Sequence, residues 1–135
     1  MYNVNMRWKT SQTAVYNLSY HLIWCPKYRR AVLEKDIANR LIELLKEKAK
    51  QIEVEIVEAN IMPDHVHLFV RTKPIHQPQF VVGNLKGYTS RILRKEFPKL
   101  KSRLPTLWTR SYYVDSVGKL NEHTIRKYIE EQKGK

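Results

Sequence analysis

Two segments with strand character lie only three residues apart, and this short connection limits the folds that the chain can adopt. Residues 53–61 alternate apolar residues with glutamates and are predicted to form a half-buried strand. Residues 65–71 are predicted to form the next strand. Met62-Pro63-Asp64 between them is typical of a turn, because proline fixes φ and aspartate can bond its own backbone. We therefore expect an antiparallel hairpin here.

The other patterns place this hairpin between helices and further strands. β-Branched and aromatic residues are typical of strands, whereas apolar residues at helical spacing with charges opposite are typical of amphipathic helices. Pro26 is expected to end the first strand, Pro98 to stop the second helix, and Asn121 to cap the last one. By these criteria the remaining predicted elements are strands at 14–25 and 107–117, and helices at 35–51, 78–97 and 121–133.

The resulting order is strand–helix–strand–strand–helix–strand–helix, which is the split βαβ or ferredoxin-like pattern with one helix added. We predict an α+β fold in which two helices cover one face of an antiparallel sheet and the other face is free for a ligand. With 135 residues and no composition break, residues 1–135 are expected to form one domain. No apolar run reaches the length of a membrane span, and we expect a cytoplasmic protein.

The charge of the chain is strongly positive and unevenly distributed. The formal net charge is +12, and eight basic residues between Lys86 and Arg110 face only Glu96 as an acidic neighbour. The positive electrostatic potential of such a segment favours binding of polyanions, above all nucleic acid. Aromatic residues lie between the basic ones in the sequence and are candidates for stacking with nucleic-acid bases. The alternative is a solvated basic surface over a buried aromatic core. The residues predicted to contact DNA are Lys86, Arg91, Arg94, Lys95 and Arg110.

The strand at residues 65–71 carries the clearest candidate for chemistry. His65 and His67 are two residues apart, so both imidazoles point to the same face of the sheet and can direct a nitrogen at one cation. Val66, Leu68 and Val70 point to the opposite, helix-covered face. The spacing alone is also compatible with two histidines that simply face solvent, and no third ligand is adjacent in sequence.

The C-terminal helix supplies further candidates. Tyr128 and Gln132 are four residues apart and lie on one helical face, so a phenol and an amide oxygen can reach the same point. In the alternative interpretation, Tyr128 joins Ile125 and Ile129 in the core and Gln132 lies at its rim.

Four ordered sequence blocks resemble a known family. They are residues 20–30 (YHLIWCPKYRR), 62–68 (MPDHVHL), 85–91 (LKGYTSR), and 107–118 followed by 128–132 (YIEEQ). With these blocks the chain resembles the single-tyrosine transposases of small bacterial and archaeal insertion sequences, within the HUH (His-hydrophobe-His) nuclease superfamily. The resemblance covers nearly all of the chain.

The resemblance implies a specific chemistry. His65, His67 and Gln132 would hold a divalent metal, Mg²⁺ or Mn²⁺, and Tyr128 would attack the scissile phosphate of single-stranded DNA folded into hairpins. The product would be a 5′-phosphotyrosine link and a free 3′-hydroxyl. The family also implies a homodimer with composite active sites, in which Gly118 would act as a hinge.

Two other functions remain open at this stage. One is a domesticated relative that processes palindromes instead of a mobile element. The other is a non-catalytic nucleic-acid-binding module, although RNA-binding proteins of this fold place aromatic residues where this chain has two histidines.

Overall fold

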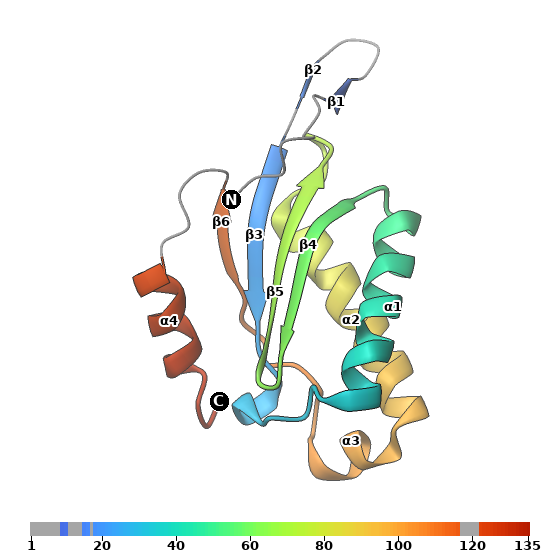
Figure 1. Ribbon diagram of the computed structural model, residues 1–135, viewed down its shortest axis with the longest axis vertical. Helices are drawn as coiled ribbons and strands as arrows, with labels where there is room; N and C mark the ends of the chain where they lie inside the picture. Colours follow the sequence, from blue (N-terminus) through green and yellow to red (C-terminus); the bar gives the residue numbers. More distant parts are fainter. Residues whose placement is uncertain (1–8, 11–14, 17, 117–121) are drawn as a thin grey trace.

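The computed structural model describes residues 9–10, 15–16, 18–116 and 122–135. Within these ranges it contains four helices, one 3-10 turn and six strands (Figure 1). In chain order they are β1 (Lys9–Thr10), β2 (Val15–Tyr16), β3 (Leu18–Trp24), η1 (Lys27–Arg29), α1 (Lys35–Gln51), β4 (Glu55–Met62), β5 (His65–Thr72), α2 (Pro78–Glu96), α3 (Pro98–Arg103), β6 (Tyr113–Ser116) and α4 (Glu122–Glu131).

The predicted α+β fold is confirmed. Strands β4, β5, β3 and β6 form one sheet in that order, and every neighbouring pair is antiparallel. This is the strand order of a ferredoxin-like sheet, with α1 and α2 as its two crossover helices. The expected hairpin is also present, because β4 and β5 pair up to Met62 and His65 and only Pro63 and Asp64 connect them.

The main core lies between one face of this sheet and the helices α1 and α2. The alternating residues Val66, Leu68 and Val70 of β5 are fully buried there, against Leu41 and Leu44 of α1. Figure 1 shows α1 and α2 together on this side of the sheet and α4 on the other. The histidines that alternate with the buried valines therefore point to the face on which α4 lies.

Two predicted strands differ from the structure. The segment predicted as one strand at 14–25 divides into β2, which pairs with β1, and β3, which joins the main sheet. The strand predicted at 107–117 was too long, because β6 covers only Tyr113–Ser116. Leu107 and Trp108 are buried in the core, and an isolated bridge joins Trp108 to Pro26. Their apolar character reflects this burial and not a continuous strand.

The predicted helices agree more closely with the structure. Helix α1 has the predicted bounds, and α2 ends at Glu96, before Pro98. Pro98 also begins a short helix, α3, that was not predicted, and proline is well suited to this first helical position. The expected roles of Gly118 and Asn121 fall outside the described residues. None of the helices within the described ranges is long and apolar enough to cross a membrane.

Candidate active site

His65 is held in a defined orientation at the start of β5. Its Nδ1 atom lies 2.9 Å from Oδ1 of Asp64, the turn residue before it. Because a carboxylate accepts, Nδ1 carries the hydrogen, and Nε2 is the nitrogen left for another partner. The second oxygen of Asp64 lies 3.3 Å from Nε of Arg29. Asp64 therefore orients His65, and Arg29 in turn holds Asp64 in place.

His67 has a different neighbour, His21 of β3. The Nδ1 atom of His21 lies 3.2 Å from Nε2 of His67, and the ring of His21 stacks on Phe69 with centroids 4.7 Å apart. Burial lowers the pKa of both histidines, and for His67 the nearby His21 lowers it further. Both rings therefore favour the neutral form, which is the form that binds a metal.

Tyr128 of α4 is partly buried, and its hydroxyl lies 2.9 Å from Oγ of Ser111. Its ring centroid is 5.9 Å from that of Tyr113 on β6. Burial raises the pKa of the Tyr128 phenol to about 12, although the hydrogen bond with Ser111 acts in the opposite direction. In this arrangement Tyr128 is a neutral phenol at physiological pH.

Gln132 follows the last turn of α4 and is almost fully buried. Its Oε1 accepts a hydrogen bond from the Ser111 hydroxyl at 3.0 Å, and its Nε2 donates to the Tyr128 carbonyl at 3.1 Å. Tyr128 and Gln132 therefore share Ser111 as a common partner, as expected for residues four positions apart on one helix.

The pocket beside the two histidines has a volume of about 480 Å³ and joins β5 to α4. Tyr128 and Gln132 do not line it. The structure thus gathers the predicted residues in two groups, His65 with His67 and Tyr128 with Gln132, on different sides of one helix. Within the described part of the chain, no group of three or more His, Cys, Asp or Glu side chains is arranged to hold a metal ion. The lining residues are Arg29, Asp64, His65, His67, Glu122, Ile125, Arg126, Ile129 and Glu130.

Three residues of this region were not predicted: His21, Arg29 and Ser111. His21 and Arg29 lie in the block at 20–30, and the alternation of β3 could have placed His21 on the face of His67. Arg29 lies in the short turn η1 and Ser111 in an irregular segment, and in neither place does sequence periodicity give a direction for a side chain. No sequence signal could have found their contacts.

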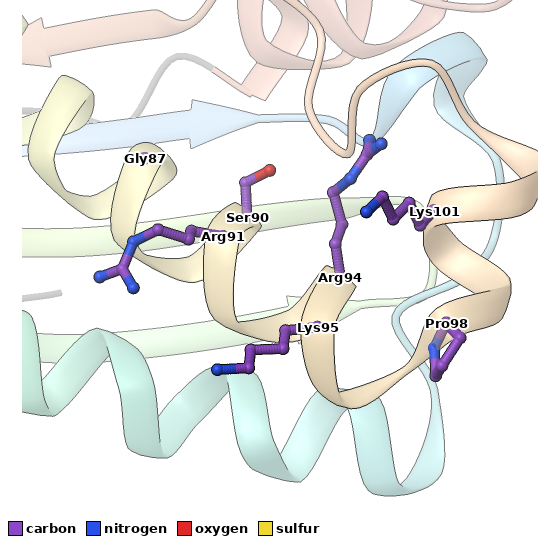
Figure 2. A pocket seen from close by; sticks show the side chains of 7 residues that line it. All are labelled: Gly87, Ser90, Arg91, Arg94, Lys95, Pro98 and Lys101. Carbon is purple, nitrogen blue, oxygen red and sulfur yellow. The ribbon is translucent and has the colours of Figure 1, made fainter.

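The predicted DNA-binding residues divide between two places. Arg91, Arg94 and Lys95 line a groove of about 720 Å³ along α2, and Lys101 of α3 joins them (Figure 2). In Figure 2, the side chain of Lys101 extends from α3 toward the side chain of Arg94 on α2. Among the described residues, none of these four cations makes an ion pair with a carboxylate. We call the residues of this groove, Gly87, Ser90, Arg91, Arg94, Lys95, Pro98 and Lys101, the basic groove.

Lys86 and Arg110 lie outside the basic groove. The Lys86 ammonium donates to the carbonyl of Thr109 at 2.5 Å and to that of Ser111 at 3.1 Å, and burial lowers its pKa to about 8. Lys86 therefore fixes the backbone that presents Ser111 to Tyr128. Arg110 is exposed on the same irregular segment.

Comparison with known proteins places these features in a family. The sequence profile described as "Transposase IS200 like" matches residues 14–132. The ISDra2 transposase TnpA of Deinococcus radiodurans is 39% identical over 129 residues, which cover 94% of this chain and 92% of that protein. A Salmonella typhimurium protein named as the transposase for insertion sequence element IS200 is 34% identical over 119 residues, covering 87% of this chain and 78% of its own.

Solved structures agree with this comparison. A crystal structure of a Deinococcus radiodurans R1 protein superimposes with a TM-score of 0.86 at 39% identity, over 92% of this chain and 97% of that one. A REP-associated tyrosine transposase bound to a REP hairpin has a TM-score of 0.57 at 11% identity, over 96% of this chain and 68% of that one. At this identity the second likeness concerns the fold alone.

Proposed function

Because the chain belongs to the IS200-like transposase family, we propose that it cleaves and rejoins single-stranded DNA at the ends of an insertion sequence, through a tyrosine nucleophile. One observation carries this proposal: the two histidines of β5, His65 and His67, share a pocket with the helix that bears Tyr128. The pocket is also lined by Arg126, an exposed arginine whose charge suits a phosphate, whereas Arg29 is already paired with Asp64.

The side chains available suit a divalent metal. His65 and His67 supply imidazole nitrogens, and the amide oxygen of Gln132 is an acceptable third ligand. Gln132 now accepts from Ser111, so it has to exchange that hydrogen bond before it can join the histidines. When bound, Mg²⁺ or Mn²⁺ would offset the charge that develops on the scissile phosphate.

Tyr128 is the proposed nucleophile. Its phenol loses a proton, its oxygen forms a bond to phosphorus, and the bond from phosphorus to the 3′-oxygen breaks, so that the 3′-hydroxyl leaves with a proton. Burial opposes the phenolate, since it holds the pKa near 12 even though the hydrogen bond with Ser111 lowers that pKa. The hydroxyl therefore has to leave this site and approach positive charge before it reacts. The resulting 5′-phosphotyrosine keeps the bond energy needed to rejoin the strand.

The basic groove is the proposed site for the backbone of a folded DNA hairpin. It gathers four cations on α2 and α3, and phosphates attract such groups strongly through counterion release. The tyrosine transposase that shares this fold was solved with a REP hairpin, which is compatible with this role. Exposed Arg110 lies close in sequence to Ser111 and is proposed to contact the strand near the cleavage site.

We further propose that the active enzyme is a homodimer whose sites combine the histidines of one chain with Tyr128 of the other. In support, the Tyr128 hydroxyl is bonded to Ser111 of its own chain and does not enter the pocket of its own histidines. Release of α4 from Ser111 would allow it to serve a second copy.

The test uses single-stranded oligonucleotides that cover the genomic flanks of the gene for this chain, labelled at either end. Only the 3′-labelled strands should transfer label to the protein, as an adduct that survives detergent, because a 5′-phosphotyrosine retains the 3′ part of the DNA. EDTA, His65→Ala and His67→Ala should each abolish the adduct.

Two tyrosine variants provide matched controls. Tyr128→Phe should form no adduct while it still binds the hairpin, whereas Tyr113→Phe should retain the adduct although its ring lies only 5.9 Å from that of Tyr128. Label transferred from the 5′ end, an adduct in Tyr128→Phe, or full activity in excess EDTA would contradict the proposed chemistry. Hairpin binding with no adduct under any metal would identify a binding module instead.

A further inference from the structure

The 3-10 turn η1 after β3 has a backbone that most residues avoid. Tyr28 and Arg29 have φ angles of 60° and 53°, both in the left-handed region. For an L-residue other than glycine this conformation is unfavourable, because Cβ comes too close to the following carbonyl oxygen. Such strain persists only where the surroundings hold it, and it is concentrated at functional sites. The side chains that this turn positions are therefore of interest.

Backbone hydrogen bonds hold the turn between two distant segments. The amide of Lys27 donates to the Leu107 carbonyl at 2.8 Å, and that of Tyr28 donates to the Lys135 carbonyl at 2.7 Å. With the turn fixed in this way, the side chain of Arg29 enters the pocket of His65 and His67 and is mostly buried there.

The guanidinium of Arg29 joins two parts of the site. Its Nε lies 3.3 Å from Oδ2 of Asp64, whose other oxygen bonds Nδ1 of His65. Its Nη1 donates to the carbonyl of Ile129 at 3.2 Å, one residue after Tyr128. A single planar group thus connects the orientation of His65 to the helix that carries Tyr128. Lysine cannot reproduce both contacts, because it has one compact ammonium in place of a fork.

We propose that Arg29 is a positioning residue, which fixes the donor face of His65 through Asp64 and couples it to the docking of α4 through Ile129. The inference rests on the proposed function for the identity of the metal-binding histidine. Since neighbouring carboxylates typically improve the metal affinity of a ligating histidine, loss of either Arg29 or Asp64 should weaken metal binding. Only loss of Arg29 should also loosen α4.

The experiment measures Mn²⁺ affinity by titration and the protection of α4 amides by hydrogen exchange, both on the full chain. Arg29→Gln and Asp64→Asn should each weaken Mn²⁺ binding by about 10- to 100-fold. The double variant should bind Mn²⁺ only slightly more weakly than either single variant, because the two residues act in one chain of contacts. Arg29→Gln should also speed exchange in α4, whereas Asp64→Asn should not.

Two further variants keep the result interpretable. Arg30→Gln removes an exposed neighbouring arginine, whose guanidinium lies 6.0 Å from the Tyr28 ring centroid, and should leave both measurements unchanged. Arg29→Lys retains the charge and should recover part of the Mn²⁺ affinity, but not the protection of α4. If Arg29→Gln or Arg29→Lys binds Mn²⁺ as the wild type does, the positioning role is wrong. If the wild type binds Mn²⁺ but forms no DNA adduct, the proposed function fails instead.

Discussion

The hydroxyl of Ser111 lies 2.9 Å from the hydroxyl of Tyr128 and donates to Oε1 of Gln132. One small side chain before β6 therefore engages both the proposed nucleophile on α4 and Gln132, which directly follows that helix. These contacts hold Tyr128 and Gln132 outside the pocket that His65 and His67 line.

Ser111→Ala should loosen α4 without abolishing cleavage. A neutral hydrogen bond contributes about 1 kcal/mol and Ser111 makes two, so the α4 amides should exchange at least roughly fivefold faster. Adduct formation should stay at or above the wild-type rate, because Ser111 stabilises the arrangement in which Tyr128 lies outside the pocket. Ser102→Ala removes a comparable hydroxyl from α3 and serves as the control. A large loss of adduct formation would instead indicate that Ser111 assists the reaction itself.

Replacement of Arg91, Arg94 and Lys95 by glutamine should weaken hairpin binding and reduce its salt dependence. The slope of log K against log salt should fall by about 0.7–0.9 for each phosphate that the variant no longer neutralises. A control variant replaces three exposed lysines outside the basic groove, Lys46, Lys50 and Lys133, and carries the same net charge. Equal slopes in the two variants would show that the basic groove faces away from the DNA.

Mixed dimers test whether the active sites are shared between chains. One parent carries Tyr128→Phe and the other carries His65→Ala with His67→Ala, so neither forms an adduct alone. If the sites combine two chains, the mixture contains one intact site per heterodimer, and adduct formation should return. Native mass spectrometry establishes subunit exchange. Exchanged heterodimers that remain inactive would show that each chain uses its own tyrosine.

The half-buried ammonium of Lys86 gives the stability of the protein a defined dependence on pH. Its pKa in the folded protein is about 8, below the value of 10.5 expected for an exposed lysine. Between these values the unfolded chain binds more protons, so the contribution of Lys86 to the free energy of unfolding rises with pH.

We therefore expect the wild type to gain stability relative to Lys86→Met from pH 8 to pH 10, as measured by urea denaturation. Lys95→Met removes an exposed lysine from the same helix and controls for the loss of one charge. A difference between wild type and Lys86→Met that stays constant or falls with pH would show that Lys86 is not desolvated as described.

The sequence predicts the sheet and its helices because these elements bury a periodic face. The alternation in β5 is sufficient to separate Val66 and Leu68 from His65 and His67. It cannot predict the segment before β6, where Leu107 and Trp108 are buried without forming a regular strand. Buried apolar residues look alike in both settings, so the predicted strand at 107–117 was too long.

The candidate site shows the same division. Spacing along the chain pairs His65 with His67 and Tyr128 with Gln132. Within each pair the two side chains lie on the same side, as predicted, but the two pairs do not meet. The distance between the pairs depends on how α4 docks, which local spacing does not determine. The contacts of Arg29 depend on a left-handed turn that few residues other than glycine favour, so nothing in the sequence indicates it.

The two left-handed residues of η1 differ in what an engineer could change. Tyr28 is exposed, and the Nζ atom of neighbouring Lys27 lies 5.1 Å from its ring centroid. Asparagine tolerates this backbone better than tyrosine, so position 28 offers a gain in thermal tolerance without touching the pocket. Arg29 bears a similar strain, but its guanidinium reaches both Asp64 and Ile129. The same turn therefore holds one residue that can be replaced to relieve backbone strain, Tyr28. Beside it lies Arg29, whose strained backbone is what brings its guanidinium to Asp64 and Ile129.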